Sequence, residues 1–405
     1  MTATRTLTYK LYPSRKQVAA LEHKLEILRT LWNGALEERI GAWRRGVRVS
    51  RSDQEKALPE IRAGFEGWKG LVHTHEAQIV LKRLDLAFLA FFRRVRAGQK
   101  PGFPRFKSRD RFPGWGYKEH GNGFRFEPGE NWEHGRVTLF GIGRMRARGI
   151  ARTPGRVLKA DVRRTVSGWF LSVVVETGCA QREAATGEPV SIDLGVSTLA
   201  TMAHADGTFE EVPNPRHLNE AAERIRDAQR GLSRLARERK ISARALRKQR
   251  RKLARAHAKV AARRKDFLHK MTARLVAAHP LIITERLTVR NMTASARGTA
   301  EEPGRNVAQK AGLNRAILDA AMAGSLNMLR YKAEEAGSEF LEADTRRLKP
   351  SQRCPDCWKV SKKALSERRH DCDCGCGMGR DEAAALVLLR WGMGEVARRN
   401  APPDP

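Results

Sequence analysis

The sequence predicts a protein of mixed class, in which an α/β domain follows an all-α segment and a small all-β module. Apolar residues at helical spacing dominate residues 13–118, and short alternating strands separated by glycines dominate 119–183. Beyond residue 187, two apolar strands each end in an acidic residue. With 405 residues, 41% of them hydrophobic, the chain is long enough for two or three compact units.

The N-terminal part begins as a strand and continues as helices. Residues 6–12 alternate as in an edge strand, and Ser14 after Pro13 is suited to cap a helix. Apolar residues then recur at helical spacing over 18–32 and again over 81–91. We expect residues 13–118 to form a helical lobe inserted after the first strand. Residues 1–12 and 119–183 would then form a small β-barrel or sandwich.

In the C-terminal half, residues 189–195 read as a buried strand with Asp193 near its end. A hairpin is expected to follow, turning at Asp206 and Gly207. Residues 280–285 form a second apolar strand that ends in Glu285. A single helix is predicted over 313–336, and the tail over 397–405 is expected to be disordered. The predicted core residues of that helix are Ile317, Leu318, Leu326 and Leu329.

Five of the six cysteines lie within residues 354–376, as in a metal site of a reducing compartment. Cys354 and Cys357 form a clear first pair, whereas the second pair is Cys372 and Cys374 or recruits Cys376. His370 is a further possible ligand, although we expect it to be an exposed histidine in a charged turn. Four thiolates leave no open coordination position on Zn²⁺, which favours a structural ion over a catalytic one.

The formal charge of +33 predicts a polyanionic partner, and a long phosphate backbone is the best match. Residues 231–265 alone hold 15 Lys and Arg, so this segment is either a solvated helical hairpin or a helix that faces phosphates. No apolar run reaches the roughly 18 to 20 residues that span a bilayer, and the N-terminus lacks the apolar core of a signal peptide. We therefore expect a cytoplasmic protein.

Three acids share one local pattern. Asp193 and Glu285 end apolar strands, and Asp381 opens an Ala-rich helix directly after the cysteine cluster. Clustered carboxylates of this kind hold the two Mg²⁺ ions of phosphodiesterases about 3.5–4 Å apart. Any one such acid is more often structural, but the three together with the basic composition favour a nuclease.

Several segments, taken in order, resemble the TnpB (OrfB) proteins of IS200/IS605-type insertion sequences, relatives of the type V CRISPR effectors. The resemblance covers nearly the whole chain. Its segments are residues 11–13 (LYP), 102–108 (GFPRFKS), 191–195 (SIDLG), 264–270 (RKDFLHK), 284–292 (TERLTVRNM), 313–319 (LNRAILD), 331–334 (YKAE), 351–357 (SQRCPDC) and 380–381 (RD).

The resemblance implies a RuvC-type, RNase H-like nuclease domain over 187–345 and 377–396, with a zinc ribbon inserted at 346–376. Residues 1–12 and 119–183 would correspond to the family's wedge domain, and 13–118 to its recognition lobe. Asp193, Glu285 and Asp381 match the family's three metal-binding acids. Because Cys374 stands where the family's last ribbon cysteine commonly stands, the resemblance favours Cys354, Cys357, Cys372 and Cys374 as zinc ligands, with Cys376 as a possible substitute.

The resemblance further implies an RNA-guided, Mg²⁺-dependent DNA endonuclease of prokaryotic mobile elements. Such a protein would bind a guide RNA from the transposon end, act as a monomer on that RNA in the nucleoid, and cut double-stranded DNA beside a short motif. Gln78 is placed to read that motif, and the segment over 231–265 would lie along guide or heteroduplex. Further candidate nucleic-acid contacts are Arg105, Lys107, Arg247 and Arg251.

Two positions depart from the family pattern. Ala383 stands where the family usually has Asn, and Arg286 stands where it usually has Asp. An Asn two residues after Asp381 could orient the acid or a metal-bound water. Because Ala383 cannot do so, a second interpretation stays open. That alternative is a guide-dependent DNA-binding protein or repressor that cuts weakly or not at all. A transposase that itself joins DNA strands is a third possibility.

Overall fold

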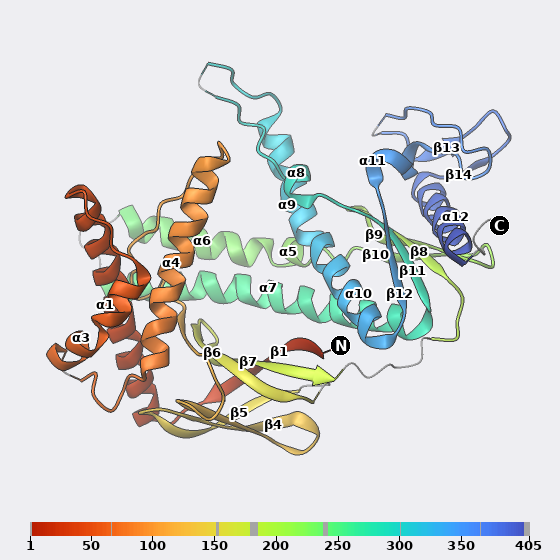
Figure 1. Ribbon diagram of the computed structural model, residues 1–405. Helices are drawn as coiled ribbons and strands as arrows, with labels where there is room; N and C mark the ends of the chain where they lie inside the picture. The colour runs from red at the N-terminus through yellow and green to blue at the C-terminus, as the bar shows by residue number, and fades with distance from the viewer. Residues whose placement is uncertain are drawn as a thin grey trace. The chain divides into compact units, whose positions relative to one another are not determined.

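The computed structural model describes residues 2–65, 67–150, 154–178, 185–237, 242–299, 301–364 and 366–400 (Figure 1). The chain divides into two compact units, Met1–Cys179 and Ala180–Pro405, and each is described by itself. Within the described ranges, no helix combines the length and the apolar character needed to cross a membrane. Cys179 and most of the linker that precedes residue 185 lie outside the described residues.

The first unit contains a seven-stranded antiparallel sheet in the order β2-β6-β7-β1-β5-β4-β3. The predicted first strand, β1, is central and not an edge, because it pairs with β7 along its length and with β5 over its last three residues. The described strands β2 and β3 end the order, so the sheet is open and not a closed barrel. Its strands are β1 Thr2–Tyr12, β2 Gly114–Tyr117, β3 Phe124–Pro128, β4 Glu133–Leu139, β5 Gly143–Ile150, β6 Arg156–Thr165 and β7 Gly168–Gly178, with a short turn of helix at Glu130–Trp132.

Helices pack onto this sheet and share its core. Ser14 caps the first of them as predicted, since its Oγ accepts a hydrogen bond from the Gln17 backbone amide. Buried Leu21, Leu25 and Leu28 of that helix belong to the same apolar core as Tyr9 and other strand residues. Residues 13–118 were predicted to be helical, but they include β2, which pairs with β6. The second part of the sheet therefore starts at Gly114 and not at residue 119. The helices are α1 Arg15–Arg44, α2 Arg51–Lys56, α3 Leu58–Gly64 and α4 Thr74–Arg96.

A fully buried ion pair joins α1 and α4 inside this core. Lys24 Nζ lies 2.6 Å from Glu76 Oε1 and donates to the Phe140 carbonyl at 2.7 Å. The Tyr117 hydroxyl donates to the same Glu76 carboxylate, and Trp115 Nε1 donates to the Tyr117 oxygen at 3.2 Å. Burial raises the pKa of Glu76 and lowers the pKa of Lys24, while their pairing opposes both shifts.

The second unit is built around a five-stranded mixed sheet in the order β10-β9-β8-β11-β12. The strands β8, β11 and β12 are parallel neighbours, and β9 and β10 form the predicted hairpin beyond β8. The strands are β8 Val190–Leu194, β9 Thr198–His204, β10 Phe209–Pro213, β11 Leu281–Glu285 and β12 Glu339–Ala343. The helices are α5 His217–Glu220, α6 Ala222–Arg237, α7 Ala243–Ala278, α8 Val289–Met292, α9 Val307–Ala320, α10 Met322–Ala336, α11 Thr345–Leu348 and α12 Arg380–Asn400.

Helices cover both faces of this sheet, giving three layers (Figure 1). Successive strand residues point to opposite faces, and β11 follows this rule. Ile282 packs in the core formed with α7 and α10, whereas Leu281 and Ile283 pack in the core formed with α12. On α12, Gly392 approaches Ile283 so closely that an added Cβ would lie 2.5 Å from the isoleucine side chain.

Three expectations for this unit are wrong. The helix predicted over 313–336 is divided into α9 and α10 at Ala321, whose φ of 52° is left-handed and interrupts the helix. Leu318, expected in the core, is 56% exposed because it lies on the outer side of α9, whereas Ile317, Leu326 and Leu329 are buried as predicted. The tail predicted to be disordered from residue 397 instead continues α12 to Asn400, and residues 401–405 lie outside the described residues.

Between β12 and α12 the chain forms a small cysteine-bearing module, which we call the ribbon (residues 346–379). It contains a short 3-10 turn, Pro350–Gln352, and a two-stranded sheet of β13 Arg369–Asp371 and β14 Gly377–Gly379. The ribbon packs against α12 and ends where that helix begins, so its position is tied to the helix that carries Asp381.

Candidate nuclease and zinc sites

Asp193 and Glu285 lie on neighbouring parallel strands and point to the same face of the sheet. Thr284 is paired with Ile192, which places Glu285 beside Asp193 at the carboxyl ends of β8 and β11. Glu285 has the same parity as Leu281 and Ile283, which face α12.

Ser191 and Asp193 are alternate residues of β8, so their side chains point to the same face of the sheet, the one that α12 covers. The buried Ser191 Oγ donates a 2.6 Å hydrogen bond to the Ala385 carbonyl of α12. Asp193, two residues further along, therefore points toward the same helix, near its beginning. Asp381 is in the first turn of that helix. Small buried residues, Ala383 to Ala385, let this turn pack closely on the sheet.

The three carboxylates interact electrostatically. Burial raises the pKa of Asp193 well above its ordinary value, and the neighbouring charges of Glu285 and Asp381 raise it further. Arg380 acts in the opposite direction on Asp193. Burial also raises the pKa of Glu285, partly offset by a hydrogen bond from Thr345. The fold has thus brought together acids that are 92 and 96 residues apart in the chain.

This donor set suits a hard cation. Within the described ranges, the only groups of three or more possible ligands whose atoms all lie within 4.8 Å of one another are in the ribbon, so the three acids are spread more widely than ligands of one ion. Two ions about 3.5–4 Å apart can be held by carboxylates that are spread more widely than the ligands of a single ion. A partly buried group of like charges also gains more from a bound cation than an exposed acid does.

The raised pKa values predict an unusual pH dependence of stability. A carboxyl group whose folded pKa exceeds its unfolded value of about 4 makes the folded state less stable at neutral pH. In the window between those two values, the folded state binds the proton first, so stability increases as pH falls. We expect metal-free protein to gain stability, relative to an Asp193→Asn/Glu285→Gln variant, when pH is lowered from about 7 to about 5. Urea unfolding at several pH values measures this difference, and a difference that is independent of pH would contradict it.

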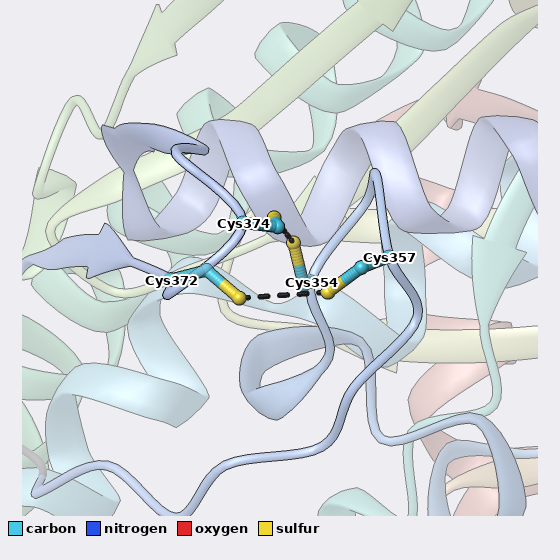
Figure 2. Close-up of side chains that lie close together, drawn as sticks. All are labelled: Cys354, Cys357, Cys372 and Cys374. Carbon is cyan, nitrogen blue, oxygen red and sulfur yellow. Dashed lines mark hydrogen bonds between the residues drawn. The ribbon is translucent and has the colours of Figure 1, made fainter.

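Four cysteine sulfurs of the ribbon face one centre (Figure 2). Cys354 Sγ lies 3.6 Å from Cys374 Sγ, and Cys357 Sγ lies 3.5 Å from Cys372 Sγ. Tetrahedral Zn²⁺ with Zn–S bonds of about 2.3 Å separates its sulfurs by about 3.8 Å, close to these values. Although burial opposes ionisation, hydrogen bonds from the backbone of Cys357 and Asp356 help lower the pKa of Cys354 to about 5. The set Cys354, Cys357, Cys372 and Cys374 therefore fits a structural zinc ion, as predicted.

The expectation that His370 is exposed is wrong. Its side chain is fully buried, because β13 pairs with β14 and turns it into the ribbon. Cys376 is also buried and lies close to both Cys354 and His370. The sequence named both residues as possible ligands, but their burial and their grouping with Cys354 depend on how the two strands pair.

The candidate nucleic-acid contacts differ in how they are held. Arg247 and Arg251 are exposed and lie one turn apart on α7, as binding to phosphates requires. Arg105 is exposed, and Lys107 Nζ lies 5.3 Å from the centre of the Trp32 ring. Gln78 is half-buried, and its Oε1 accepts a 2.7 Å hydrogen bond from Lys118. Phe103 contacts Phe88 and Phe91 at the end of α4 and remains 47% exposed.

The basic surface begins before the predicted segment 231–265, since Arg226 and Arg230 were not predicted to be part of it. Four arginines line an open groove of about 670 Å³ along one side of α6: Arg226, Arg230, Arg234 and Arg237. Their spacing of four, four and three residues places them on one helical face, which is the signal that could have identified them. Together with α7 they extend the basic surface of the second unit beyond the predicted 231–265 segment.

Comparison with known proteins identifies the family. A family model described as "Probable transposase" (OrfB of IS605) matches residues 172–296, a Cas12f1-like TNB domain matches 325–388, and the helix-turn-helix domain of the OrfB family matches 1–48. A Streptomyces pristinaespiralis protein named "Putative RNA-guided DNA endonuclease" is 32% identical over 403 residues, which cover 97% of this chain and 90% of that protein.

Two further comparisons agree. The Escherichia coli K12 protein InsQ, with the same kind of name, is 34% identical over 295 residues, which cover 72% of this chain and 67% of InsQ. A solved Cas12f1 structure, in complex with guide RNA and target DNA, matches with a TM-score of 0.56. That match covers 96% of this chain and 98% of the Cas12f1 chain at 11% identity, and so speaks for the fold alone. The chain belongs to the OrfB (TnpB) family of IS200/IS605-type insertion sequences.

Proposed function

We propose that this protein is an RNA-guided DNA endonuclease that cleaves phosphodiester bonds with Mg²⁺ at a RuvC-type site formed by Asp193, Glu285 and Asp381. The observation that supports the proposal is the arrangement of these acids. The register of β8 and β11 sets Asp193 beside Glu285, Asp381 is in the first turn of α12, and the charges of Glu285 and Asp381 act on Asp193. The names of the similar proteins and the charge of +33 support the substrate class.

In this proposal the three carboxylates would hold two Mg²⁺ ions. When bound, such ions activate water and stabilise the charge on the leaving oxygen. The chain orients the acids. Thr345, whose hydroxyl donates to the Arg286 carbonyl at 2.9 Å, lies beside the Glu285 carboxylate, and the hydrogen bond from Ser191 Oγ to the Ala385 carbonyl holds α12 against β8. Arg380, held by hydrogen bonds to the Ala364 and Glu367 carbonyls, supplies positive charge near Asp193.

Guide RNA would supply sequence recognition, while the protein reads backbone shape and a short motif beside the target. The first unit would act as the wedge and recognition domains, with Gln78, Arg105 and Lys107 among its contacts. The basic faces of α6 and α7 would track the phosphates of guide or heteroduplex. We further propose that one protein chain binds one guide RNA and acts in the nucleoid of a prokaryotic cell.

The test is to express the gene with its native flanking DNA, sequence the RNA that copurifies, and challenge the complex with a plasmid. The plasmid carries a matching target beside a randomised flank. Guide-dependent, Mg²⁺-dependent cuts next to one enriched flank would support the proposal. A complex that joins strands, or one that cuts regardless of the guide, would contradict it.

One observation favours a second candidate, a guide-dependent DNA-binding protein or repressor with weak cleavage. Ala383, which replaces the family's usual Asn, is buried with 2% exposure and offers no polar group to the acids. Under this alternative, the complex binds its target with normal affinity but does not nick it in Mg²⁺. An Ala383→Asn variant would then be expected to recover cutting.

The basic surface of α7 yields a separate prediction. Replacing both Arg247 and Arg251 with Gln removes two exposed charges without disturbing the core. If both contact phosphates, RNA affinity should fall and the slope of log affinity against log salt should decrease by about 2. Filter binding across a salt series measures the slope. The control is Arg125→Gln on β3, which is exposed in the other unit and should leave the slope within about 1 of wild type.

A further inference from the structure

The ribbon contains two overlapping groups of possible metal ligands. The first is the set of four cysteines described above. The second comprises Cys354, His370 and Cys376, whose ligand atoms all lie within 4.8 Å of one another. Cys354 belongs to both groups, so its thiolate lies between two possible positions for a metal ion.

The second group is more buried than the first. Cys354, His370 and Cys376 are all buried, whereas Cys357 and Cys374 of the first group are exposed. His370 Nε2 has no nitrogen or oxygen hydrogen-bond partner although the residue is fully buried, and the group that the imidazole contacts is the Cys354 sulfur. Sulfur is a weak hydrogen-bond partner for a buried nitrogen, and an ion held between the two atoms would satisfy both.

We propose that Cys354, His370 and Cys376 form a second ligand set for a zinc-class divalent ion. Two sulfurs and an imidazole nitrogen are typical ligands of such a borderline-soft cation. The Cys376 thiol also hydrogen-bonds the Asp356 carboxylate, and a water molecule can complete a tetrahedral site. His370 would bind through Nε2, with its proton on Nδ1. The Lys363 ammonium, which can only donate and lies against Nδ1 in this structure, would then turn away. Lys363 is half-buried and can also turn toward solvent.

Sharing Cys354 gives the ribbon a way to retain metal. When an exposed thiol of the first set is oxidised or substituted, the ion can move to the buried set while it stays bound to Cys354. When both sets are filled, the Cys354 thiolate bridges two ions. This inference concerns metal retention and stands independently of the proposed nuclease activity.

The test measures zinc content in the full-length chain after dialysis against a weak chelator. We expect Cys374→Ser to retain about one zinc ion per chain, because the second set replaces the first. Cys354→Ser, which damages both sets, should reduce zinc by about tenfold or more, as should Cys374→Ser combined with Cys376→Ser or with His370→Ala. Cys179→Ser, a cysteine outside the ribbon sequence, serves as the matched control and should change nothing.

Two outcomes would overturn the proposal. The first is that Cys374→Ser is as empty of zinc as Cys354→Ser, and the second is that the two double variants keep as much zinc as Cys374→Ser alone. The single variants Cys376→Ser and His370→Ala retain the four-cysteine set and should keep zinc, which separates ligand loss from misfolding. In cobalt-loaded Cys374→Ser protein, the thiolate-to-cobalt absorption should weaken further when Cys376 is removed, and an unchanged band would also contradict the second set.

Discussion

Asp193→Asn should reduce DNA cleavage by about 10³-fold or more while leaving RNA copurification unchanged. Removing a carboxylate that holds the metal ions forfeits several kcal/mol of charge stabilisation, and each loss of about 1.4 kcal/mol lowers the rate tenfold. The substitution keeps the shape of the Asp193 side chain, which projects from β8 toward α12. Single-turnover plasmid cleavage in Mg²⁺, beside RNA content and guide binding, measures both effects.

Although Asp193→Asn should lower cleavage, it should raise the thermal stability of the metal-free protein. Because burial and the like charges of Glu285 and Asp381 raise the pKa of Asp193, the ionised carboxylate destabilises the metal-free fold at neutral pH. The neutral amide should therefore raise Tm in the absence of Mg²⁺, and Mg²⁺ should raise Tm in wild-type protein more than in the variant. The matched control is Glu211→Gln, an exposed acid on β10 of the same sheet, which should leave cleavage and Tm unchanged. Loss of both DNA cleavage and RNA binding in Asp193→Asn would indicate that Asp193 is needed for folding and would contradict its assignment as a catalytic residue.

Glu76→Leu should destabilise the first unit by about 3–5 kcal/mol. The change leaves the fully buried Lys24 ammonium without its partner, and an unpaired buried charge is far more costly than the pair. It also removes the acceptor of the Tyr117 hydroxyl. Urea unfolding followed by tryptophan fluorescence suits the measurement, because six of the eight tryptophans lie in residues 1–179.

The double variant Lys24→Met/Glu76→Leu separates pairing from packing. Replacing both charges with apolar side chains of similar volume should recover much of the lost stability. An exposed pair in the same unit, Arg144 with Glu127, provides the control, and Glu127→Gln should cost less than about 1 kcal/mol. If Glu76→Leu behaves like the surface control, the ion pair contributes little to the fold.

Much of this protein is readable from local sequence. The Ser14 cap, the spacing from Leu21 to Trp32 and the hairpin at Gly207 each follow from interactions within a few residues, and the structure contains all of them. The cysteine set was predicted from spacing and family resemblance, and the sulfur positions fit it. The Asp193 and Glu285 strands were predicted because a buried strand is a short apolar run whose end is marked by the first acid.

Other features were not predictable because they depend on contacts between distant segments. β1 alternates like an edge strand, but it is central because both neighbours come from beyond residue 140. Helix α9 ends at Ala321, although no proline or glycine marks the break. His370 reads as a charged surface residue and is buried only because β13 pairs with β14.

By itself, the sequence determined the residue types of this protein's chemistry: three acids at element ends, a cysteine cluster and a strongly basic surface. Tertiary structure decided which of them meet. Parallel pairing of β8 with β11 sets Asp193 beside Glu285, and the close packing of α12 through Ala385 and Gly392 directs Asp381 to the same edge. The physical reason is that propensity and spacing act over a few residues, whereas the position of a carboxylate depends on register and packing between segments about 90 residues apart.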